Sequence, residues 1–446
     1  MQRVAWVRMA GFENSAARAV RRPMIPAGEA LKMKRLAAVL LSLTLTAAAQ
    51  TAPRDLHWAG SWATSPMRPG PSVVPPTSVF TNTTFREIVH LSTGGEYVRV
   101  RLSNVFGAGP MRVTSVHIAE PVSAASSQIE PGTDTVVTFF GKQGVTIPAG
   151  AAYVSDPVKF DAKPLSNLAV SFHIDAPPAP ETYHDNSNAT SYFAHGDQVS
   201  AAELANEVKV NHWYWLTGVE VGTPQQDRCV VAFGDSITDG WQSTVNGNNR
   251  WPDELARRLQ ANPGTRDVCV LNEGISGNRV LLDGTGPAAV RRLDRDVLSQ
   301  PGVKYVVVLE AINDIGHLAQ SGDKSQADVD TLVKHLEEAY QEIIDAAHAR
   351  GLTVIGATLT PYGGSGYDKA GGPMYQAAWR KVNDWIRQPG HFDYVVHFNK
   401  VTADPSDPSR FAPSLDSGDH LHPNPAGYRA MAKAFDLKWF EEPSSR

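Results

Sequence analysis

The sequence predicts an α/β domain with a parallel sheet, preceded by an all-β sandwich or jelly-roll domain. Over residues 55–222, short alternating segments are separated by frequent Gly and Pro, with no sustained helical period, which is typical of β-sandwiches. Over residues 228–441, short apolar runs alternate with segments of helical period, which implies a parallel sheet covered by helices on both faces. The 446 residues are enough for two or three domains with a substantial core.

The first 50 residues are interpreted as a leader and signal peptide. Lys34 and Arg35 precede an apolar run over residues 36–49 that ends in three alanines. A basic start, a short apolar run and a small-residue end describe a secretory signal peptide, here over about residues 33–49. The run is shorter than the ~20 residues of a membrane span, so we expect a secreted or periplasmic protein. Residues 1–32 are a misassigned start or a long basic leader.

Composition and charge describe an ordinary soluble protein. Hydrophobic residues make up 42% of the chain and charged residues 20%. The formal net charge of −5 gives no reason to expect nucleic acid or an anionic membrane as a partner. The two cysteines, Cys229 and Cys269, cannot make a disulfide framework, and because both lie in predicted central strands we expect buried free thiols rather than a bridge.

The β-domain is expected to contain at least seven short strands. Residues 85–91 and 97–102 flank Gly94-Gly95, which predicts a hairpin. The other expected strands cover residues 113–119, 135–140, 154–160, 168–174 and 214–221. A polar linker over residues 223–227 separates this domain from the next one.

The α/β domain is expected to alternate five strands with helices. The strands cover residues 229–233, 268–271, 305–309, 353–359 and 394–398, and the helices residues 252–260, 287–298, 326–349 and 375–386. An apolar stripe runs through the third helix, and Gly351 is expected to end it. Asn424 and Pro425 have the residue types of the cap and first position of a last helix.

A serine follows the first strand of this domain, at the carboxyl end where open α/β sheets bind ligands. It is Ser236, in the segment Phe233-Gly234-Asp235-Ser236-Ile237. A serine is a poor nucleophile unless a base lies beside it. The candidate base is His422, in the segment Asp419-His420-Leu421-His422-Pro423 near the C-terminus.

Two further blocks also end predicted strands. One is Asn-Glu-Gly-Ile-Ser-Gly-Asn over residues 272–278, and the other is Glu-Ala-Ile-Asn-Asp over residues 310–314. Together with the serine and histidine segments, they resemble the SGNH (GDSL-type) hydrolase family, whose name-giving residues would here be Ser236, Gly277, Asn313 and His422. The resemblance runs from about residue 228 to 440 and implies a three-layer, flavodoxin-like α/β/α fold.

The resemblance also implies an esterase mechanism, and the spacing of the residues agrees with it. Asp419 can accept a hydrogen bond from Nδ1 of His422, which leaves Nε2 free to take the Ser236 proton. The oxyanion would be bound by the backbone N–H of Ser236, the backbone N–H of Gly277 and the side-chain amide of Asn313. The α/β-hydrolase motif Gly-x-Ser-x-Gly is absent.

Two alternatives concern the C-terminal segment. His420 is a rival base, but it directly follows Asp419, which is poor geometry for a side-chain pair, so it is interpreted as a packing residue. Asp416, Asp419, His420 and His422 also cluster closely enough to consider a metal site, although Ser236 would then have no role. We expect neither a metal nor a cofactor.

One residue departs from the family pattern. Ala311 stands where the family has a glycine in its third block, a one-methyl change beside the expected oxyanion hole. The chain looks most similar to two-domain members active on xylan and other carbohydrates, which favours a secreted acetylesterase acting on carbohydrates. The alternatives are a GDSL-type lipase or lysophospholipase, and a non-catalytic polysaccharide-binding protein.

Overall fold

The computed structural model describes residues 55–70, 77–225 and 227–441. These described residues belong to one compact unit. The leader and signal peptide expected over residues 1–50 lie outside the described residues. Within the described ranges, no helix combines the length and apolarity needed to cross a membrane.

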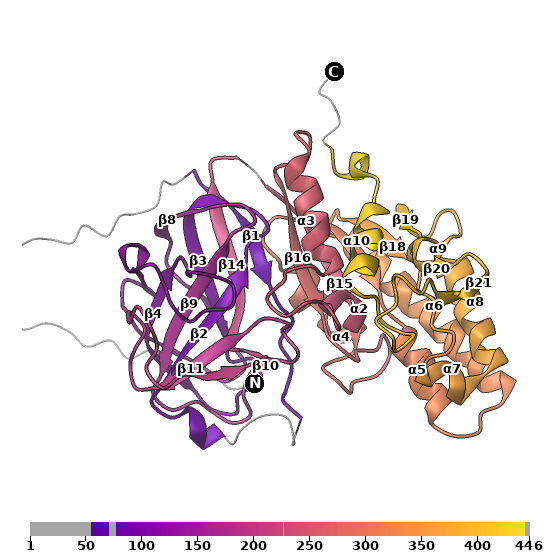
Figure 1. Cartoon of the computed structure of the whole chain (residues 1–446), viewed down its shortest axis with the longest axis horizontal. Helices are drawn as coiled ribbons and strands as arrows, with labels where there is room; N and C mark the ends of the chain where they lie inside the picture. The colour runs from indigo at the N-terminus through magenta and orange to yellow at the C-terminus, as the bar shows by residue number, and fades with distance from the viewer. Residues whose placement is uncertain (1–54, 71–76, 226, 442–446) are drawn as a thin grey trace, which may run out of the picture. The chain divides into compact units, whose positions relative to one another are not determined.

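Five parallel strands form the sheet of the α/β region, which we define as residues 228–440 (Figure 1). They are β15 (Arg228–Gly234), β16 (Val268–Gly274), β17 (Val303–Leu309), β18 (Thr353–Ala357) and β19 (Tyr394–Val396). Their spatial order, β16-β15-β17-β18-β19, is the flavodoxin-like order. The strand order therefore reverses between β15 and β17, where open α/β sheets bind their ligands.

Helices follow these strands in alternation, which confirms the predicted α/β order. They are α2 (Ser236–Asp239), α3 (Trp251–Ala261), α4 (Ala289–Leu293), the π-helix η3 (Asp294–Leu298), α5 (Ile312–Gln320), α6 (Gln326–His348), α7 (Gly366–Gly371), α8 (Pro373–Ile386), α9 (Phe398–Thr402), α10 (Pro425–Lys433) and the 3-10 helix η4 (Leu437–Phe440). A small two-stranded sheet, β20 (Ala403–Asp404) and β21 (Asp407–Phe411), lies between α9 and α10. Because crossovers are right-handed, the helix before β16 and the helices between β17 and β19 cover opposite faces.

The long helix α6 shows why the sequence pattern is reliable here. Ser325 caps it by accepting the Asp328 N–H, and the Asp328 carboxylate accepts the Ser325 N–H in return. Its apolar stripe is buried against the sheet and α8, and Tyr340 stacks on Trp385 of α8 with ring centroids 5.7 Å apart. Gly351 follows with φ of 71°, a left-handed conformation that ends helices.

Antiparallel strands fill the β-sheet region, residues 57–223. They are β1 (His57–Ala63), β2 (Thr83–His90), β3 (Gly95–Ser103), β4 (Met111–Ala119), β5 (Thr135–Val137), β6 (Val145–Ile147), β7 (Ala152–Val154), β8 (Val158–Ala162), β9 (Asn167–Ile174), β10 (Tyr183–His184), β11 (Ser191–His195), β12 (Val208–Val210), β13 (Trp213–Tyr214) and β14 (Leu216–Thr223), with 3-10 turns η1 (Thr77–Phe80) and η2 (Pro131–Thr133).

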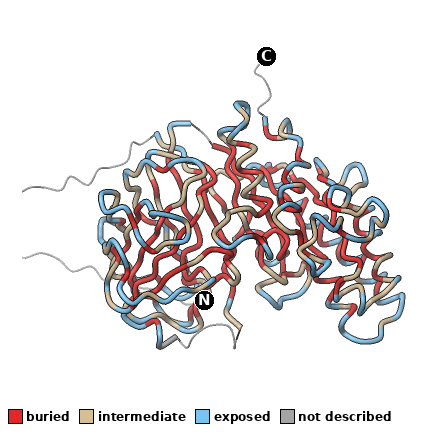
Figure 2. The backbone as a smooth tube through the Cα atoms, viewed as in Figure 1, coloured by how far each residue is buried: buried red, intermediate tan, exposed pale blue. Residues whose placement is uncertain are grey.

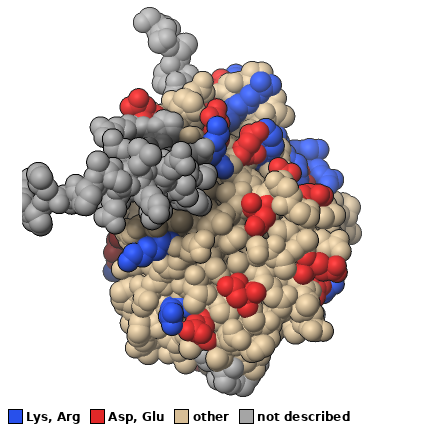
Figure 3. Space-filling view, turned by 90° about the vertical axis from the view of Figure 1, so that its left-hand side faces the viewer, with Lys and Arg blue, Asp and Glu red and all other residues tan. Residues whose placement is uncertain are grey.

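Two large sheets of this region share one core. One has the order β1-β14-β3-β7 with β8 on β3, and the other β12-β11-β2-β9-β4-β5 with β6 on β4. Val100 and Val219 of the first sheet and Phe85 and Phe172 of the second belong to one hydrophobic cluster, and Figure 2 shows buried backbone along these strands. A β-rich region is therefore confirmed, while its jelly-roll topology stays a prediction. On the face shown in Figure 3, acidic and basic side chains are scattered among uncharged ones.

The predicted hairpin at Gly94-Gly95 is wrong. The two strands flanking it, β2 and β3, lie in different sheets: β2 pairs with β9 and β11, and β3 pairs with β14, β7 and β8. A two-residue hairpin turn needs positive φ, and neither glycine has it. The segment that connects β2 to β3 instead contacts β1: the Ser92 N–H donates to the Ser61 carbonyl at 2.8 Å.

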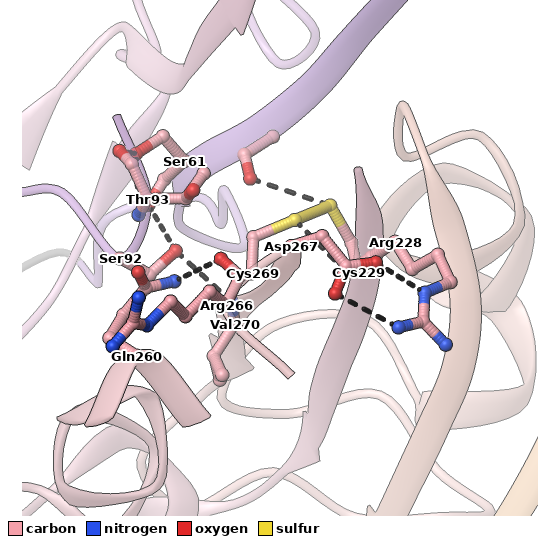
Figure 4. Close-up of a disulfide and its surroundings, with 11 residues drawn as sticks. Ser61, Ser92, Thr93, Arg228, Cys229, Gln260, Arg266, Asp267, Cys269 and Val270 are labelled. Carbon is pink, nitrogen blue, oxygen red and sulfur yellow. Dashed lines mark hydrogen bonds and ion pairs between the residues drawn. A yellow bond between two sulfur atoms is a disulfide. The ribbon is translucent and has the colours of Figure 1, made fainter. Parts of the chain in front are cut away.

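The expectation of free thiols is also wrong, because Cys229 and Cys269 form a disulfide (Figure 4). The two residues are register partners on the adjacent parallel strands β15 and β16, with Cα atoms 4.5 Å apart. That distance lies within the range that a disulfide bridges. The sequence identified both strands but not their register, and register alone decides this pairing.

Replacing both cysteines by alanine is expected to lower the free energy of unfolding by about 2–4 kcal/mol. The bridge closes a loop with a sequence separation of 40 residues, which restricts the unfolded chain. Denaturant unfolding of the wild type and the double variant measures the difference. The wild type unfolded with a reductant is the control and should match the double variant. Equal stability of all three samples would contradict a stabilising bridge.

Candidate active site

The nucleophile candidate Ser236 is the first residue of α2, directly beyond the carboxyl end of β15. Asp235 caps this helix by accepting the Ile237 N–H at 2.9 Å. Gly234 ends the strand where a Cβ would lie 2.1 Å from Oγ1 of Thr238, so only glycine lets the chain turn this closely. The serine is thereby held at the switch point of the sheet.

Ser236, His422 and Asp419 form a chain of hydrogen bonds. The Ser236 Oγ lies 2.8 Å from His422 Nε2, and His422 Nδ1 lies 2.6 Å from Asp419 Oδ2. A carboxylate only accepts, so Nδ1 carries a hydrogen and Nε2 can accept from the serine. Burial alone would raise the Asp419 pKa, but the hydrogen bond and charge of His422 lower it well below its usual range. The arrangement is that of a nucleophile, a base and an orienting acid.

The neighbouring histidine has a separate partner. His420 Nδ1 lies 2.5 Å from Asp416 Oδ2, and its side chain is 46% exposed. The four acidic and histidine side chains of this segment thus divide into two pairs. Among the described residues, no three His, Cys, Asp or Glu side chains are arranged to hold a metal ion.

The expected oxyanion donors lie on the loop after β16 and at the start of α5. Asn313 is fixed at both ends of its amide, because Nδ2 donates to the Asn278 carbonyl and Oδ1 accepts from the Tyr367 hydroxyl, each at 2.9 Å. Its second Nδ2 hydrogen is left for a ligand. Gly277 has φ of 79°, in the left-handed region. Within the described residues, neither the Ser236 N–H nor the Gly277 N–H donates a hydrogen bond.

Ala311 has an unusual backbone conformation. It is fully buried at the N-cap of α5 with φ of 100°, a value that favours glycine. The positive φ at this position therefore explains why the family has a glycine there. A non-glycine residue in such a conformation costs on the order of 1–3 kcal/mol, and such strain is typical of functional sites.

Several supporting residues could not be found from the sequence. Tyr367, which orients Asn313, lies in a segment without a recognisable motif. Arg292 is fully buried and joins two strand-end segments: it donates to the carbonyl of Gly234 at the end of β15, and to the carbonyl of Glu273 and Oδ1 of Asn278 in the block at the end of β16, at 2.9, 2.7 and 2.9 Å. Of these supporting residues, only Asn278 had a signal in the sequence, because it directly follows Gly277 in the second block.

Three buried carboxyl groups interact with one another next to the serine: Asp235, Glu310 and Asp314. Burial raises the pKa of Asp235 to about 7 and that of Asp314 to about 6. Burial also raises the pKa of Glu310, although this group is paired with Arg292 at 3.0 Å. Asp314 accepts the N–H groups of Val280 and Leu281, at 2.8 and 3.1 Å, and so fixes the loop that continues from Asn278.

Asp235→Asn is expected to flatten the dependence of stability on pH between about 4 and 7. In that window the unfolded wild type has released the Asp235 proton, which the folded protein retains because its pKa is about 7. The free energy of unfolding therefore falls as pH rises, by at most about 1.4 kcal/mol per pH unit from this group. An amide cannot ionise and still caps the helix.

Urea unfolding at pH 4, 6 and 8 checks this expectation. The variant should be more stable than the wild type at pH 8, and the difference should shrink toward pH 4. A difference that does not change with pH would show that Asp235 does not titrate in this window.

One known protein family matches the part of the chain that contains these residues. Residues 232–430 match the family model described as GDSL-like Lipase/Acylhydrolase family. This segment contains the serine, the histidine and both loops of the expected oxyanion hole. No curated protein matches the chain.

Solved structures similar to the chain include three esterases or lipases. A GDSL-like lipase from Bacteroides thetaiotaomicron VPI-5482 has 17% identity, covers 46% of this chain and 85% of its own, and has a TM-score of 0.33. An acetyl xylan esterase has 22% identity, 46% and 96% coverage and a TM-score of 0.33. A carbohydrate acetylesterase from Sinorhizobium meliloti has 15% identity, 47% and 96% coverage and a TM-score of 0.34. The family match alone assigns residues 232–430 to a GDSL-like lipase/acylhydrolase domain, and this domain makes the protein a carboxylic ester hydrolase.

Proposed function

We propose that the protein is an exported serine esterase that removes short O-acyl groups, acetyl above all, from carbohydrates. The observation that carries the proposal is the hydrogen-bonded series Ser236–His422–Asp419 beside Gly277 and Asn313. This combination supplies a nucleophile, a base and donors for an oxyanion, which together serve acyl transfer.

The geometry supports the following reaction. The Ser236 Oγ attacks the ester carbonyl carbon while its proton passes to His422 Nε2. The tetrahedral oxyanion is bound by the N–H groups of Ser236 and Gly277 and by Nδ2 of Asn313. As the C–O bond to the alcohol breaks, Nε2 gives its proton to the leaving alkoxide oxygen. A water, deprotonated by His422, then attacks the acyl-enzyme and releases the carboxylic acid and Ser236.

The substrate class is proposed from the leader and the strand-end loops. The signal-peptide pattern over residues 33–49 would place the enzyme among extracellular polymers, many of which carry O-acetyl esters. The loops around the serine are rich in Gly, Asn, Asp and Ser, which suits a small acyl group. The Trp241 ring lies 6.1 Å from the His422 ring and offers an apolar face beside the base.

The proposal is tested by acetate release from acetylated xylan and by a panel of aryl esters from acetate to palmitate, with Ser236→Ala as the blank. We expect turnover to be highest for acetate and acetate to be released from a glycan. A preference for long acyl chains with no acetate released would overturn the substrate assignment.

A second candidate, hydrolysis of long-chain acyl esters, is favoured by one hollow near the oxyanion residues. It has a volume of about 620 Å³ and is bordered by four leucines, Leu281, Leu282, Leu318 and Leu332. Arg279, which follows Asn278, also lines it. Leu282 is 61% exposed, so Leu282→Asp should leave folding intact. A selective loss of palmitate turnover in this variant would favour the second candidate, whereas an unchanged chain-length profile would remove the hollow from substrate binding.

Asn313→Ala is expected to lower kcat about 100- to 1,000-fold, because it removes one oxyanion donor. It also leaves the Asn278 carbonyl and the Tyr367 hydroxyl without their partner, so the melting temperature should fall as well. Tyr367→Phe is the matched variant: it keeps the Asn313 amide and removes only the hydroxyl that orients it, so its loss should be smaller. Steady-state kinetics on an aryl acetate measures both. Unchanged turnover in Asn313→Ala would exclude its side chain from the oxyanion hole.

A further inference from the structure

The loop that carries Gly277 is held by a carboxylate that does not belong to the Ser236–His422–Asp419 series. Ser276, which precedes Gly277, donates its N–H and its Oγ–H to Oδ2 of Asp239, at 3.0 and 2.6 Å. Asp239 is the last residue of α2 and is 3% exposed. The position of the Gly277 N–H is therefore set partly by where the Asp239 carboxylate lies.

Asp239 is held in turn by a histidine from the β-sheet region. His184 of β10 is 2% exposed, and its Nε2 lies 3.0 Å from Asp239 Oδ1. Its Nδ1 lies 2.9 Å from the Ser65 carbonyl oxygen, which only accepts, so Nδ1 carries a hydrogen. The His184 ring also packs on Trp213, with centroids 5.4 Å apart.

The protonation of this pair follows from its partners. Oδ2 of Asp239 already accepts two hydrogen bonds from Ser276, as an ionised carboxylate does. Oδ1 then accepts from Nε2–H, so that both ring nitrogens of His184 carry hydrogens. Burial opposes this charge, but the attraction and hydrogen bond of Asp239 outweigh burial and raise the His184 pKa. The contact is a buried, charge-assisted hydrogen bond, stronger than a neutral one.

We propose that His184 is a positioning residue for the oxyanion hole: through Asp239 and Ser276, it fixes the Gly277 N–H where the oxyanion forms. The β-sheet region then contributes to the active site by supplying this positioning residue. This inference rests on the proposed esterase function, since an oxyanion hole has no purpose without acyl transfer.

A second contact from the β-sheet region reaches the same scaffold. Ser65, whose carbonyl accepts from His184, donates its Oγ–H to Glu273 Oε2 at 2.7 Å and accepts from Arg292 Nη1 at 2.9 Å. Arg292 also holds the Glu273 carbonyl and Oδ1 of Asn278, on either side of the Ser276–Gly277 turn. Ser65 and His184 thus both contact side chains that hold this turn, Ser65 through Arg292 and His184 through Asp239.

The expected effect is on turnover more than on substrate binding. Removing one oxyanion donor costs about 100- to 1,000-fold in kcat, and misplacing a reacting group by about 1 Å can cost 100-fold. Since His184→Ala leaves the Gly277 N–H present but less well placed, we expect kcat to fall about 10- to 100-fold. KM should stay within about threefold, because the ground-state carbonyl depends less on these donors.

The matched control is a second His–Asp pair in the same region. His117 Nδ1 of β4 lies 2.9 Å from Asp134 Oδ1, and both side chains are largely buried. His117→Ala breaks a comparable pair within the β-sheet region itself, so its kcat should stay within about twofold of the wild type. His184→Gln, which keeps an amide donor for Asp239, should recover part of the lost kcat. Wild-type turnover in His184→Ala, or an equal loss in His117→Ala, would overturn the proposal.

A double-mutant cycle separates positioning from general damage. If His184 acts through Asp239, then the double variant His184→Ala/Asp239→Ala should lose little more kcat than the worse single variant. Fully multiplicative losses would overturn the proposal. Should His184→Ala not fold, Asp239→Asn decides, because it keeps an oxygen for Ser276 but removes the charge that binds His184, and wild-type kcat in that variant would overturn the proposal. Ser236→Ala keeps the two questions apart: if it remains active, then the esterase mechanism itself fails.

Discussion

Ser236→Ala is expected to fold like the wild type and to lose about a million-fold in kcat on any ester that the wild type hydrolyses. The expected loss is this large because the side chain supplies the attacking oxygen and cannot be replaced by its neighbours. The substitution removes one oxygen atom at the start of α2, where the cap comes from Asp235 and not from the serine. Stability should therefore change by less than about 1 kcal/mol.

The measurement is steady-state turnover of an aryl acetate with protein purified to remove contaminating esterases. Ser299→Ala is the control, since Ser299 is exposed directly after η3 and its hydroxyl donates to the Arg295 carbonyl. A fluorophosphonate probe should label the wild type and Ser299→Ala but not Ser236→Ala. Turnover within tenfold of the wild type in Ser236→Ala would disprove nucleophilic catalysis by this serine.

The secondary structure of the α/β region follows closely from the sequence, because its strands and helices carry strong local signals. The buried strands are continuous apolar runs, and the long helix α6 has both an apolar stripe and a capping box. The predicted helix over residues 287–298 is continuous in the chain but divides into α4 and the π-helix η3. Local periodicity does not distinguish these two forms.

The β-sheet region was less predictable because pairing depends on distant residues. The segments expected as strands β2, β3, β4, β9 and β14 are strands, but residues 154–160 divide between β7 and β8, and β2 and β3 occupy different sheets. The disulfide between Cys229 and Cys269 was not predicted for the same reason, since only the register of β15 with β16 brings the two sulfur atoms together.

At the site, the sequence indicated candidates for contact with substrate but not the residues that hold these candidates in place. Ser236, Gly277, Asn313 and His422 each lie in a recognisable block at a strand end. Their supports, including Tyr367, Arg292 and His184, come from positions with no local pattern and are defined by three-dimensional contacts alone. A buried Arg and a buried His are ordinary residues in a sequence until their partners are known.

His422→Ala is expected to lose as much kcat as Ser236→Ala, about a million-fold, while His420→Ala should lose less than about tenfold. The two histidines form a matched pair, because each donates Nδ1–H to its own aspartate on the same short segment. Only His422 places Nε2 next to the serine, at 2.8 Å. Without it, the Ser236 proton has no acceptor and the leaving alkoxide has no proton donor.

The difference between the two variants tests the base more sharply than either loss alone. Both remove an imidazole from one carboxylate, so any general effect on the loop should appear in both, and melting temperatures will show whether it does. The double variant His422→Ala/Ser236→Ala should be no worse than either single variant, because nucleophile and base act as one unit. If His420→Ala instead suffers the large loss and His422→Ala retains turnover, the base is His420, and the Asp416–His420 pair takes the place of Asp419–His422 in the reaction.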